Sequence, residues 1–286
     1  EYEDLILRVE GRADGIFTQN EKICIDEIKG VYKNLELLAE PVLVHRAQAL
    51  CYAWIYLDDH GLEEIDVQMT YAHLDTEMIK RFRETMTREE LESWYQRLLD
   101  SYHKWLSYQM KWREERNRSM EKLEFPFTYR KGQKEMVAGI YHAISRKEQI
   151  FIQAPTGVGK TMSAVFPAVR SIGEGKAETL FYLTARTITR TVAQDAFEIL
   201  RKNGLLFKTV TITAKEKLCF CEKPECNPET CPYAKGHYDR INDAVYELWT
   251  NEQSFDRETI LRQAEKWQVC PFEMSLELSV WMDAVI

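Results

Sequence analysis

The N-terminal part of the chain contains short strand-like patterns and one long helical pattern. Residues 10–17 and 22–30 are predicted strands, and the turn-like residues 18–21 between them make the pair a hairpin. Residues 65–71 alternate between apolar and polar positions as a half-buried strand does. Over residues 91–106, apolar and aromatic side chains recur at helical spacing, which favours a helix packed into a core over a platform for stacking bases.

The second half of the chain has the pattern of an α/β domain. The charged run 111–118 extends the preceding helix and is expected to be solvated, and residues 125–127, Phe-Pro-Phe, mark a domain border. Further on, apolar runs separated by helical patterns predict parallel strands, with any ligand at the C-terminal ends of these strands. These runs are 149–153, 179–184 and 208–213. An apolar stripe over residues 241–249 predicts that residues 218–286 are mostly helical.

Composition and charge narrow the class of protein. Hydrophobic residues make up 45% and charged residues 29%, and no apolar run is long enough to span a membrane, so we expect a cytoplasmic globular protein. The net charge is −8, but residues 121–217 hold 16 basic and 9 acidic side chains, a balance that suits a nucleic-acid backbone. The candidate backbone contacts are Arg186, Arg190, Lys215 and Lys217. A solvated basic face is the alternative.

Residues 154–161, Ala-Pro-Thr-Gly-Val-Gly-Lys-Thr, have the spacing of a loop that holds a nucleoside triphosphate. In such a loop the glycines let backbone N–H groups approach the phosphates, the lysine reaches the β- and γ-phosphates, and the threonine hydroxyl holds Mg²⁺. The usual first glycine is replaced by Ala154. The predicted nucleotide-binding residues of this loop are Thr156, Gly157, Val158, Gly159, Lys160 and Thr161.

Five of the seven cysteines lie within residues 219–270. A close group followed by one distant thiol fits an iron–sulfur cluster or a structural zinc ion. The predicted ligands are Cys219, Cys226, Cys231 and Cys270, with Cys221 as an alternative first ligand. The two CxxC pairs of a zinc finger are absent, which makes a zinc site less favoured than an iron–sulfur cluster. A disulfide framework does not suit an intracellular nucleotide-binding chain.

Folding the N-terminal hairpin brings Asp14 close to Asp26 and Glu27. Glu27 and Lys29 are two residues apart in a strand and therefore share one face. Two carboxylates beside a lysine suit metal-dependent hydrolysis. The acids hold Mg²⁺ or Mn²⁺, and the lysine orients the attacking water or stabilises the charged transition state.

The phosphate loop and the cysteine set together resemble the XPD/DinG-type superfamily 2 DNA helicases that carry an iron–sulfur domain. The resemblance covers roughly residues 121–286. Its motifs are Tyr129-Arg130-Lys131-Gly132-Gln133 on the adenine side, the loop 154–161, Leu183–Thr187 as motif Ia, and residues 217–219 and 269–273 at the ends of the cysteine set. It adds Arg130 and Gln133 to the expected nucleotide-binding residues. By the same analogy Phe127 and Tyr129 are candidates to stack on adenine, with a packed linker as the alternative.

This resemblance implies an ATP-dependent DNA helicase of 5′-to-3′ polarity that acts in DNA repair on single-stranded or forked DNA, with ATP, Mg²⁺ and a [4Fe–4S] cluster. The implied fold is a RecA-like parallel sheet over residues 121–217 and a mostly helical iron–sulfur insertion over residues 218–286. His237, Tyr238 and Arg240 are candidates for single-strand contact or for a structural role. The family's Asp-Glu-Ala-His box does not occur up to Ile286, so we expect a fragment with negligible ATP turnover of its own.

The N-terminal residues resemble the RecB-like branch of the PD-(D/E)xK nucleases, over roughly residues 1–75. That branch adds a QxxxY helix, which Gln48 and Tyr52 supply at i and i+4 on one helix face. The implied fold is an α/β nuclease-like domain, extended by a helical linker to residue 120. The implied catalytic residues are Asp14, Glu27, Lys29, Gln48 and Tyr52, with Mg²⁺ or Mn²⁺ as the metal. The family's acidic residue on an upstream helix is missing from this sequence.

The favoured function is therefore a DNA helicase with a fused, metal-dependent nuclease domain. A single-strand DNA nuclease as the main activity and a DNA-binding scaffold with inactive sites are the alternatives. Loss of nucleotide binding in Lys160→Ala would favour the motor, and loss of cleavage in Asp14→Ala would favour the nuclease. DNA binding without either activity would favour the scaffold.

Overall fold

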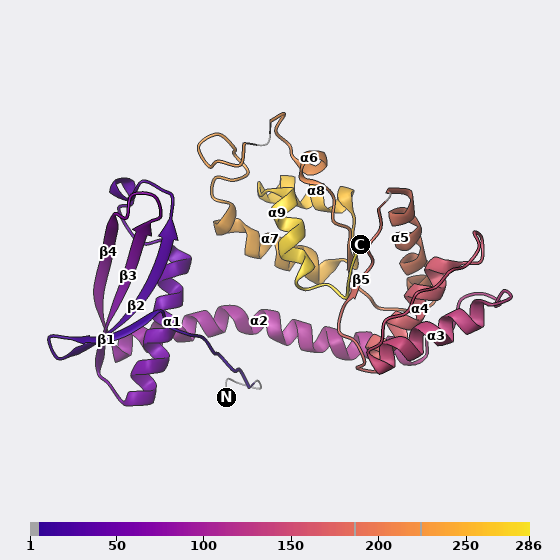
Figure 1. Ribbon diagram of the computed structural model, residues 1–286, viewed down its shortest axis with the longest axis horizontal. Coiled ribbons are helices and arrows are strands. Elements are labelled where there is room, and N and C mark those ends of the chain that lie inside the picture. The colour runs from indigo at the N-terminus through magenta and orange to yellow at the C-terminus, as the bar shows by residue number, and fades with distance from the viewer. Residues whose placement is uncertain (1–5, 186, 224) are drawn as a thin grey trace. The chain divides into compact units, whose positions relative to one another are not determined.

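The computed structural model describes residues 6–185, 187–223 and 225–286 (Figure 1). The chain divides into two compact units, Glu1–Lys104 and Trp105–Ile286, and the long helix α2, Arg88–Glu121, continues across this division. The border expected near residue 120 lies within α2. The units divide earlier because Trp105 is buried in a core of the second unit.

The first unit is built on a sheet in the order β1-β2-β3-β4. β1 (Gly15–Gln19) pairs antiparallel with β2 (Lys22–Val31), and β2 pairs parallel with β3 (Glu64–His73). β4 (Ile79–Thr87) pairs antiparallel with β3. The predicted hairpin and the predicted strand 65–71 are confirmed, but the first strand of the hairpin begins at Gly15 rather than at residue 10 and continues to Gln19, through residues expected in the turn.

Helix α1 (Leu43–His60) connects β2 to the parallel strand β3 and covers one face of the sheet, after the short helical turn η1 (Leu35–Leu37) (Figure 1). Its buried positions recur at helical spacing because one stripe of the helix faces the strands. They are Ala49, Leu50, Ala53 and Leu57. Alternate residues of the strands belong to the same core, including Ile25, Val67 and Met69. Glu27 follows Ile25 at the strand repeat, so its side chain also faces α1.

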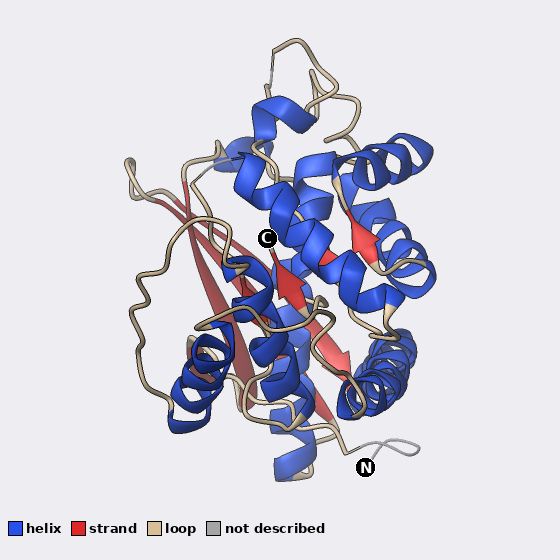
Figure 2. Cartoon of the chain, turned by 90° about the vertical axis from the view of Figure 1, so that its right-hand side faces the viewer, coloured by secondary structure: helices blue, strands red, loops and turns tan. Residues whose placement is uncertain are grey.

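The second unit combines short strands with helices (Figure 2). The helices of this unit, apart from α2, are α3 (Gln133–Arg146), α4 (Lys160–Gly173), α5 (Thr187–Lys202), α6 (Lys215–Leu218), α7 (His237–Asn251), α8 (Arg257–Trp267) and α9 (Pro271–Ser279). The strands are β5 (Leu180–Phe181), β6 (Thr209–Val210), β7 (Ser254–Phe255) and β8 (Ala284–Val285). Residues 218–286 are mostly helical in the described part, as predicted.

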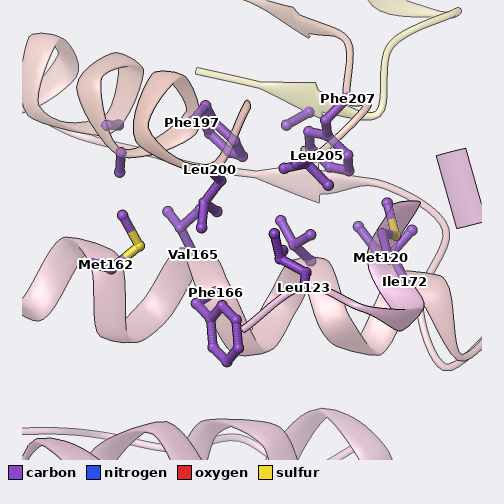
Figure 3. Close-up of a cluster of buried hydrophobic side chains, with 14 of the residues drawn as sticks. Met120, Leu123, Met162, Val165, Phe166, Ile172, Phe197, Leu200, Leu205 and Phe207 are labelled. Atoms are coloured by element: carbon purple, nitrogen blue, oxygen red, sulfur yellow. The ribbon is translucent and has the colours of Figure 1, made fainter. Parts of the chain in front are cut away.

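The strands of the second unit form a parallel sheet in the order β5-β8-β6-β7, which confirms a mixed α/β fold with a parallel sheet. A hydrophobic core lies on each face of this sheet. Ala284 and Ile286 belong to the core that includes α4 and α5, whereas Val285 between them belongs to the core that includes α7, α8 and α9. Figure 3 shows the first core, in which Phe197 and Leu200 of α5 point toward Val165 of α4.

The strand predicted at residues 149–153 is wrong. This segment has no ladder with any described strand, and the side chain of Phe151 is 94% exposed. An apolar run becomes a strand only where a neighbouring strand forms hydrogen bonds with its backbone N–H and C=O groups. Here β5, β6, β7 and β8 pair with one another, and none of them pairs with this segment. The two other predicted strands are present as β5 and β6 but are shorter than expected.

The run 111–118 of α2 is not wholly solvated, contrary to the expectation from its charges. Trp112 and Arg116 are buried, and both bond to Asp283, at 3.0 Å through the indole Nε1 and at 2.5 Å through the guanidinium. The backbone N–H of Lys208 donates to the same carboxylate at 2.8 Å. A buried carboxylate thus ties α2 to the segment that leads into β6. No helix in the described part of the chain is long and apolar enough to cross a membrane.

Candidate functional site

The loop 154–161 has the backbone geometry that its glycines predict. Gly157 and Gly159 have φ angles of 82° and 78°, and α4 begins directly after Gly159. Positive φ angles are strained for residues with a Cβ, so glycine is required at these turns. The Lys160 ammonium donates to the backbone oxygens of Ala154 at 3.0 Å and Pro155 at 2.8 Å. The lysine side chain therefore lies across its own loop.

Two residues of the segment expected on the adenine side contact this loop directly. The Arg130 guanidinium donates to the Gly157 carbonyl oxygen, and the Arg130 backbone N–H donates to the side-chain oxygen of Gln133 at 3.0 Å. Gln133 is buried against the loop, since a Cβ added at Gly159 would lie 2.6 Å from the Gln133 amide nitrogen. The structure thus brings together motifs that are more than twenty residues apart in the sequence.

A pocket of about 710 Å³ lies over this contact. Of the predicted nucleotide-binding residues, all but Val158 line it: Arg130, Gln133, Thr156, Gly157, Gly159, Lys160 and Thr161. Phe127 lines the pocket as well, whereas Tyr129 stacks on Phe125 with ring centroids 4.3 Å apart. Of the two aromatic candidates, Phe127 therefore lies at the pocket, and Tyr129 packs against another side chain.

One wall of the pocket was not foreseen from the sequence. It is formed by α5, which contributes Thr189, Val192, Asp195, Ala196 and Ile199. These residues recur at three- to four-residue intervals, so they form one helix face. The same periodicity describes any amphipathic helix, and only the packing of α5 beside α4 turns this face into a wall of the pocket.

Residues 130–226 match the model of the DEAD/DEAH box helicase family. The matched stretch contains Arg130, Gln133 and the whole phosphate loop, and it extends to Cys226. The match supports a helicase superfamily, nucleotide binding with Mg²⁺, and a nucleic-acid partner for this part of the chain. A search of curated protein sequences gave no match.

The cysteine set lines one pocket of about 290 Å³, at the end of the helicase match and beyond it. Its thiols are Cys219, Cys221, Cys226, Cys231 and Cys270. The sulfur atoms of Cys221 and Cys231 are 3.9 Å apart. Burial and the neighbouring thiol of Cys231 raise the pKa of Cys221 to about 11, and burial raises the pKa of Cys270. Across the described residues, no group of three or more His, Cys, Asp or Glu side chains is arranged to hold a metal ion.

Of the three candidates for single-strand contact beyond Cys231, two have structural contacts and one is exposed. His237 is buried, and its Nδ1 accepts the Cys270 backbone N–H at 3.2 Å. Arg240 donates to the backbone oxygens of Lys235, Gln268 and Trp267, so its guanidinium is used inside the unit. Tyr238 is exposed and lines the cysteine pocket.

The four basic candidates for backbone contact also differ in their surroundings. Arg186 lies outside the described residues. Arg190 donates to the Thr213 hydroxyl at 3.4 Å, and its buried Nε has no partner among the described residues. Lys215 lies 3.6 Å from the Glu273 carboxylate, and Lys217 is exposed.

In the first unit, four of the five predicted nuclease residues form one hydrogen-bonded chain. The Lys29 ammonium donates to Glu27 Oε1 at 2.5 Å and to Gln48 Oε1 at 3.1 Å. The Gln48 amide then donates to the Tyr52 hydroxyl at 3.2 Å. Strand β2 supplies the first two residues and α1 the other two, so the packing of α1 on the sheet assembles the group.

The carboxylates of the hairpin have different partners. Glu27 is 1% exposed, and its Oε2 has no hydrogen-bond partner among the described residues. Asp14 is exposed, and its Oδ2 accepts the backbone N–H of Ile28 at 2.9 Å, which places it beside Glu27. Asp26 instead accepts hydrogen bonds from Gln68 and Thr70, because it alternates to the other face of the sheet.

Proposed function

We propose that this chain carries the nucleotide-binding part of an ATP-dependent DNA helicase with a fused nuclease domain. The observation that carries the helicase proposal is the contact of Arg130 with the Gly157 carbonyl and of Gln133 with Gly159, inside the stretch that matches the DEAD/DEAH box family. It joins an adenine-side segment to a phosphate loop around one pocket. Movement from 5′ to 3′ and a place in DNA repair are part of this proposal.

The residues of the pocket have distinct roles in it. Lys160 exchanges its two backbone acceptors for the β- and γ-phosphates, because phosphate oxygens carry more negative charge than carbonyl oxygens. Thr161 supplies a hydroxyl oxygen for Mg²⁺, which neutralises phosphate charge when bound. Arg130 and Gln133 fix the adenine side, and Phe127 offers an aromatic face to the base.

The cysteine pocket belongs to the same proposal as the site of a [4Fe–4S] cluster. Its support is that five thiols line one pocket, among them the four that the resemblance expects as ligands. Cys226, Cys231 and Cys270 would be ligands, with either Cys219 or Cys221 as the fourth. Cluster binding favours thiolates, so it would lower the thiol pKa values that burial raises.

DNA binding by the helicase part is tested with a fluorescent oligothymidylate. We expect the chain to bind it with an affinity that falls as salt rises, since phosphates are neutralised by basic side chains. Arg190→Ala should weaken binding, and Arg113→Ala, an exposed arginine of α2, should not. Equal binding by both variants would remove Arg190 from the interface, and no binding by the unmodified chain would contradict the DNA-helicase proposal.

The nuclease function is carried by a second observation, the chain from Glu27 through Lys29 and Gln48 to Tyr52 with an unpaired buried oxygen on Glu27. A buried carboxylate oxygen without a donor is costly unless a cation or a proton occupies it. Glu27 and Asp14 therefore fit as ligands of Mg²⁺ or Mn²⁺, and such a metal supplies an activated water and charge stabilisation when bound. Lys29, fixed by Gln48, is placed to orient that water or stabilise the charged phosphate.

The test is Mn²⁺-dependent cleavage of end-labelled single-stranded DNA by the full chain. Glu27→Gln and Asp14→Ala should both abolish cleavage, whereas Glu64→Gln, a change at the start of β3, should leave it intact. Cleavage that survives in Glu27→Gln would show that the activity resides elsewhere. Absence of cleavage in the unmodified chain would refute the nuclease proposal and leave the helicase proposal standing.

A further inference from the structure

His45 lies on the face of α1 that carries the nuclease residues. It precedes Gln48 by three positions and Tyr52 by seven, so all three side chains share one side of the helix. Its ring is partly buried against β3, with ring centroids 5.8 Å from Tyr71. The helix face therefore presents an imidazole one turn before the glutamine that holds Lys29.

The hydrogen bonds of Tyr71 settle which nitrogen of His45 carries the proton. The hydroxyl oxygen of Tyr71, a side chain that is buried, accepts the Val42 backbone N–H at 3.0 Å, and His45 Nδ1 lies 3.2 Å from the same oxygen. The hydroxyl hydrogen needs an acceptor, and His45 Nδ1 is the acceptor that the described residues offer. Leaving that buried hydrogen without an acceptor would cost free energy, so Tyr71 donates and Nδ1 accepts.

A neutral ring with an acceptor at Nδ1 has its proton on Nε2. Burial lowers the pKa of His45, and the nearby charges of Lys29 and Lys33 lower it further, so the ring is neutral at pH 7. Among the described residues Nε2–H has no hydrogen-bond acceptor. Lys33, whose charge also acts on the ring, is exposed and forms no ion pair with a described residue.

An unused N–H donor near a lysine that forms no ion pair with a described residue is suited to an anion. We propose that His45 binds a phosphate of the nucleic-acid strand by donating Nε2–H to a non-bridging oxygen, with Lys33 adding electrostatic attraction. The inference rests on the proposed nuclease function and specifies how that site holds its substrate. The group then extends along α1: Lys29 contacts the Glu27 carboxylate, Gln48 contacts Lys29, and His45 lies one helical turn closer to the start of α1.

A purely structural role for His45 would use only its bond to Tyr71, and two substitutions separate the roles. In His45→Asn the side-chain oxygen takes the place of Nδ1 and keeps the acceptor for Tyr71, but the Nε2 donor is lost. In His45→Gln the amide nitrogen reaches the position of Nε2 and restores a donor. His60→Asn is the matched control, because His60 is an exposed histidine of the same helix whose Nδ1 contacts the Tyr56 backbone oxygen.

The first measurement is cleavage kinetics on single-stranded DNA with Mn²⁺. We expect His45→Asn to raise KM at least tenfold with a smaller change in kcat, His45→Gln to recover part of the loss, and His60→Asn to behave as the unmodified chain. An unchanged KM in His45→Asn would overturn the inference while cleavage by the unmodified chain upholds the nuclease. Loss of activity in all three variants would also overturn it, because the control would share the defect.

The second measurement decides the inference if the unmodified chain does not cleave. Thymidine 3′,5′-bisphosphate with Ca²⁺ is titrated into the full chain with ¹³C-labelled histidine, and the His45 signal is assigned by its absence in His45→Asn. A shift of this signal, with the His60 signal unmoved, supports phosphate binding on a fold that does not hydrolyse DNA. A His45 signal that stays in place at saturating ligand overturns it, whatever the state of the nuclease proposal.

Discussion

The Arg130 guanidinium donates to the backbone oxygen of Gly157, a residue of the phosphate loop. This bond joins the two sides of the nucleotide pocket. Because the Arg130 side chain is exposed, its hydrogen bond contributes modestly, on the order of 1 kcal/mol. We expect Arg130→Ala to weaken nucleotide binding about fivefold, as measured by displacement of a fluorescent ATP analogue. Arg146→Ala, a change of an exposed arginine at the end of α3, should have no effect.

Gly159→Ala is expected to damage the pocket more than a backbone penalty alone explains. The added Cβ would come within 2.6 Å of the Gln133 amide, and the residue has a φ of 78°. Gly175→Ala is the matched control, because Gly175 has a φ of 70° with open space around its Cβ position. Both variants should lose about 1 kcal/mol of stability, because alanine is strained at a positive φ, and Gly159→Ala alone should lose nucleotide binding. Similar binding by the two variants would contradict the placement of Gln133 against the loop.

Lys208 predicts an unusual dependence of stability on pH. Its side chain is 1% exposed, donates to the backbone oxygens of Trp249 and Glu252, and lies 4.3 Å from the Trp112 ring centroid. Burial lowers its pKa from 10.5 to about 8. Between these values the unfolded chain binds a proton that the folded chain has lost, so raising the pH favours the folded state.

The contribution of Lys208 should therefore rise with pH from 8 to 10.5, by about 1.4 kcal/mol per pH unit at most. Urea unfolding at pH 7.5, 9 and 10 measures it as the difference between the unmodified chain and Lys208→Met. The variant should lack this rise, and Lys202→Met at the exposed end of α5 should retain it. Parallel pH profiles for the unmodified chain and Lys208→Met would contradict the lowered pKa.

Iron content tests the role of the cysteine pocket. In an anaerobic preparation Cys270→Ser should lose iron and sulfide, whereas Cys51→Ser, outside the pocket, should keep both. Comparing Cys219→Ser with Cys221→Ser identifies the fourth ligand, since only the variant that lacks a ligand should lose the cluster. Stoichiometric zinc without iron or sulfide would overturn the cluster assignment.

Local patterns in the sequence predicted the parts of the fold that depend on neighbouring residues. The hairpin of β1 and β2 follows from its turn, since Asn20 and Glu21 both have positive φ angles that a two-residue turn requires. The helical spacing of Gln48 and Tyr52 likewise placed both on one face, where they bond to each other. The positive φ angles of Gly157 and Gly159 agree with the phosphate-loop motif.

Features that depend on distant partners could not be predicted in this way. Arg116 looked solvated because its neighbours are charged, and its partner Asp283 lies 167 positions away. The segment 149–153 has an apolar pattern without a paired strand, and a pattern does not reveal whether a neighbour is present. His45 carried no motif, and its tautomer follows only from the contact of Tyr71 with Val42.

The central claim is that the loop 154–161 binds a nucleoside triphosphate, and titration calorimetry with MgATP tests it most directly. We predict saturable binding at one site by the unmodified chain, and a loss of at least tenfold in affinity, about 1.4 kcal/mol, in Lys160→Ala. Lys202→Ala, an exposed lysine that does not line the pocket, should bind as the unmodified chain does. Equal affinities for MgATP in Lys160→Ala and the unmodified chain, or no binding by the unmodified chain, would contradict the claim.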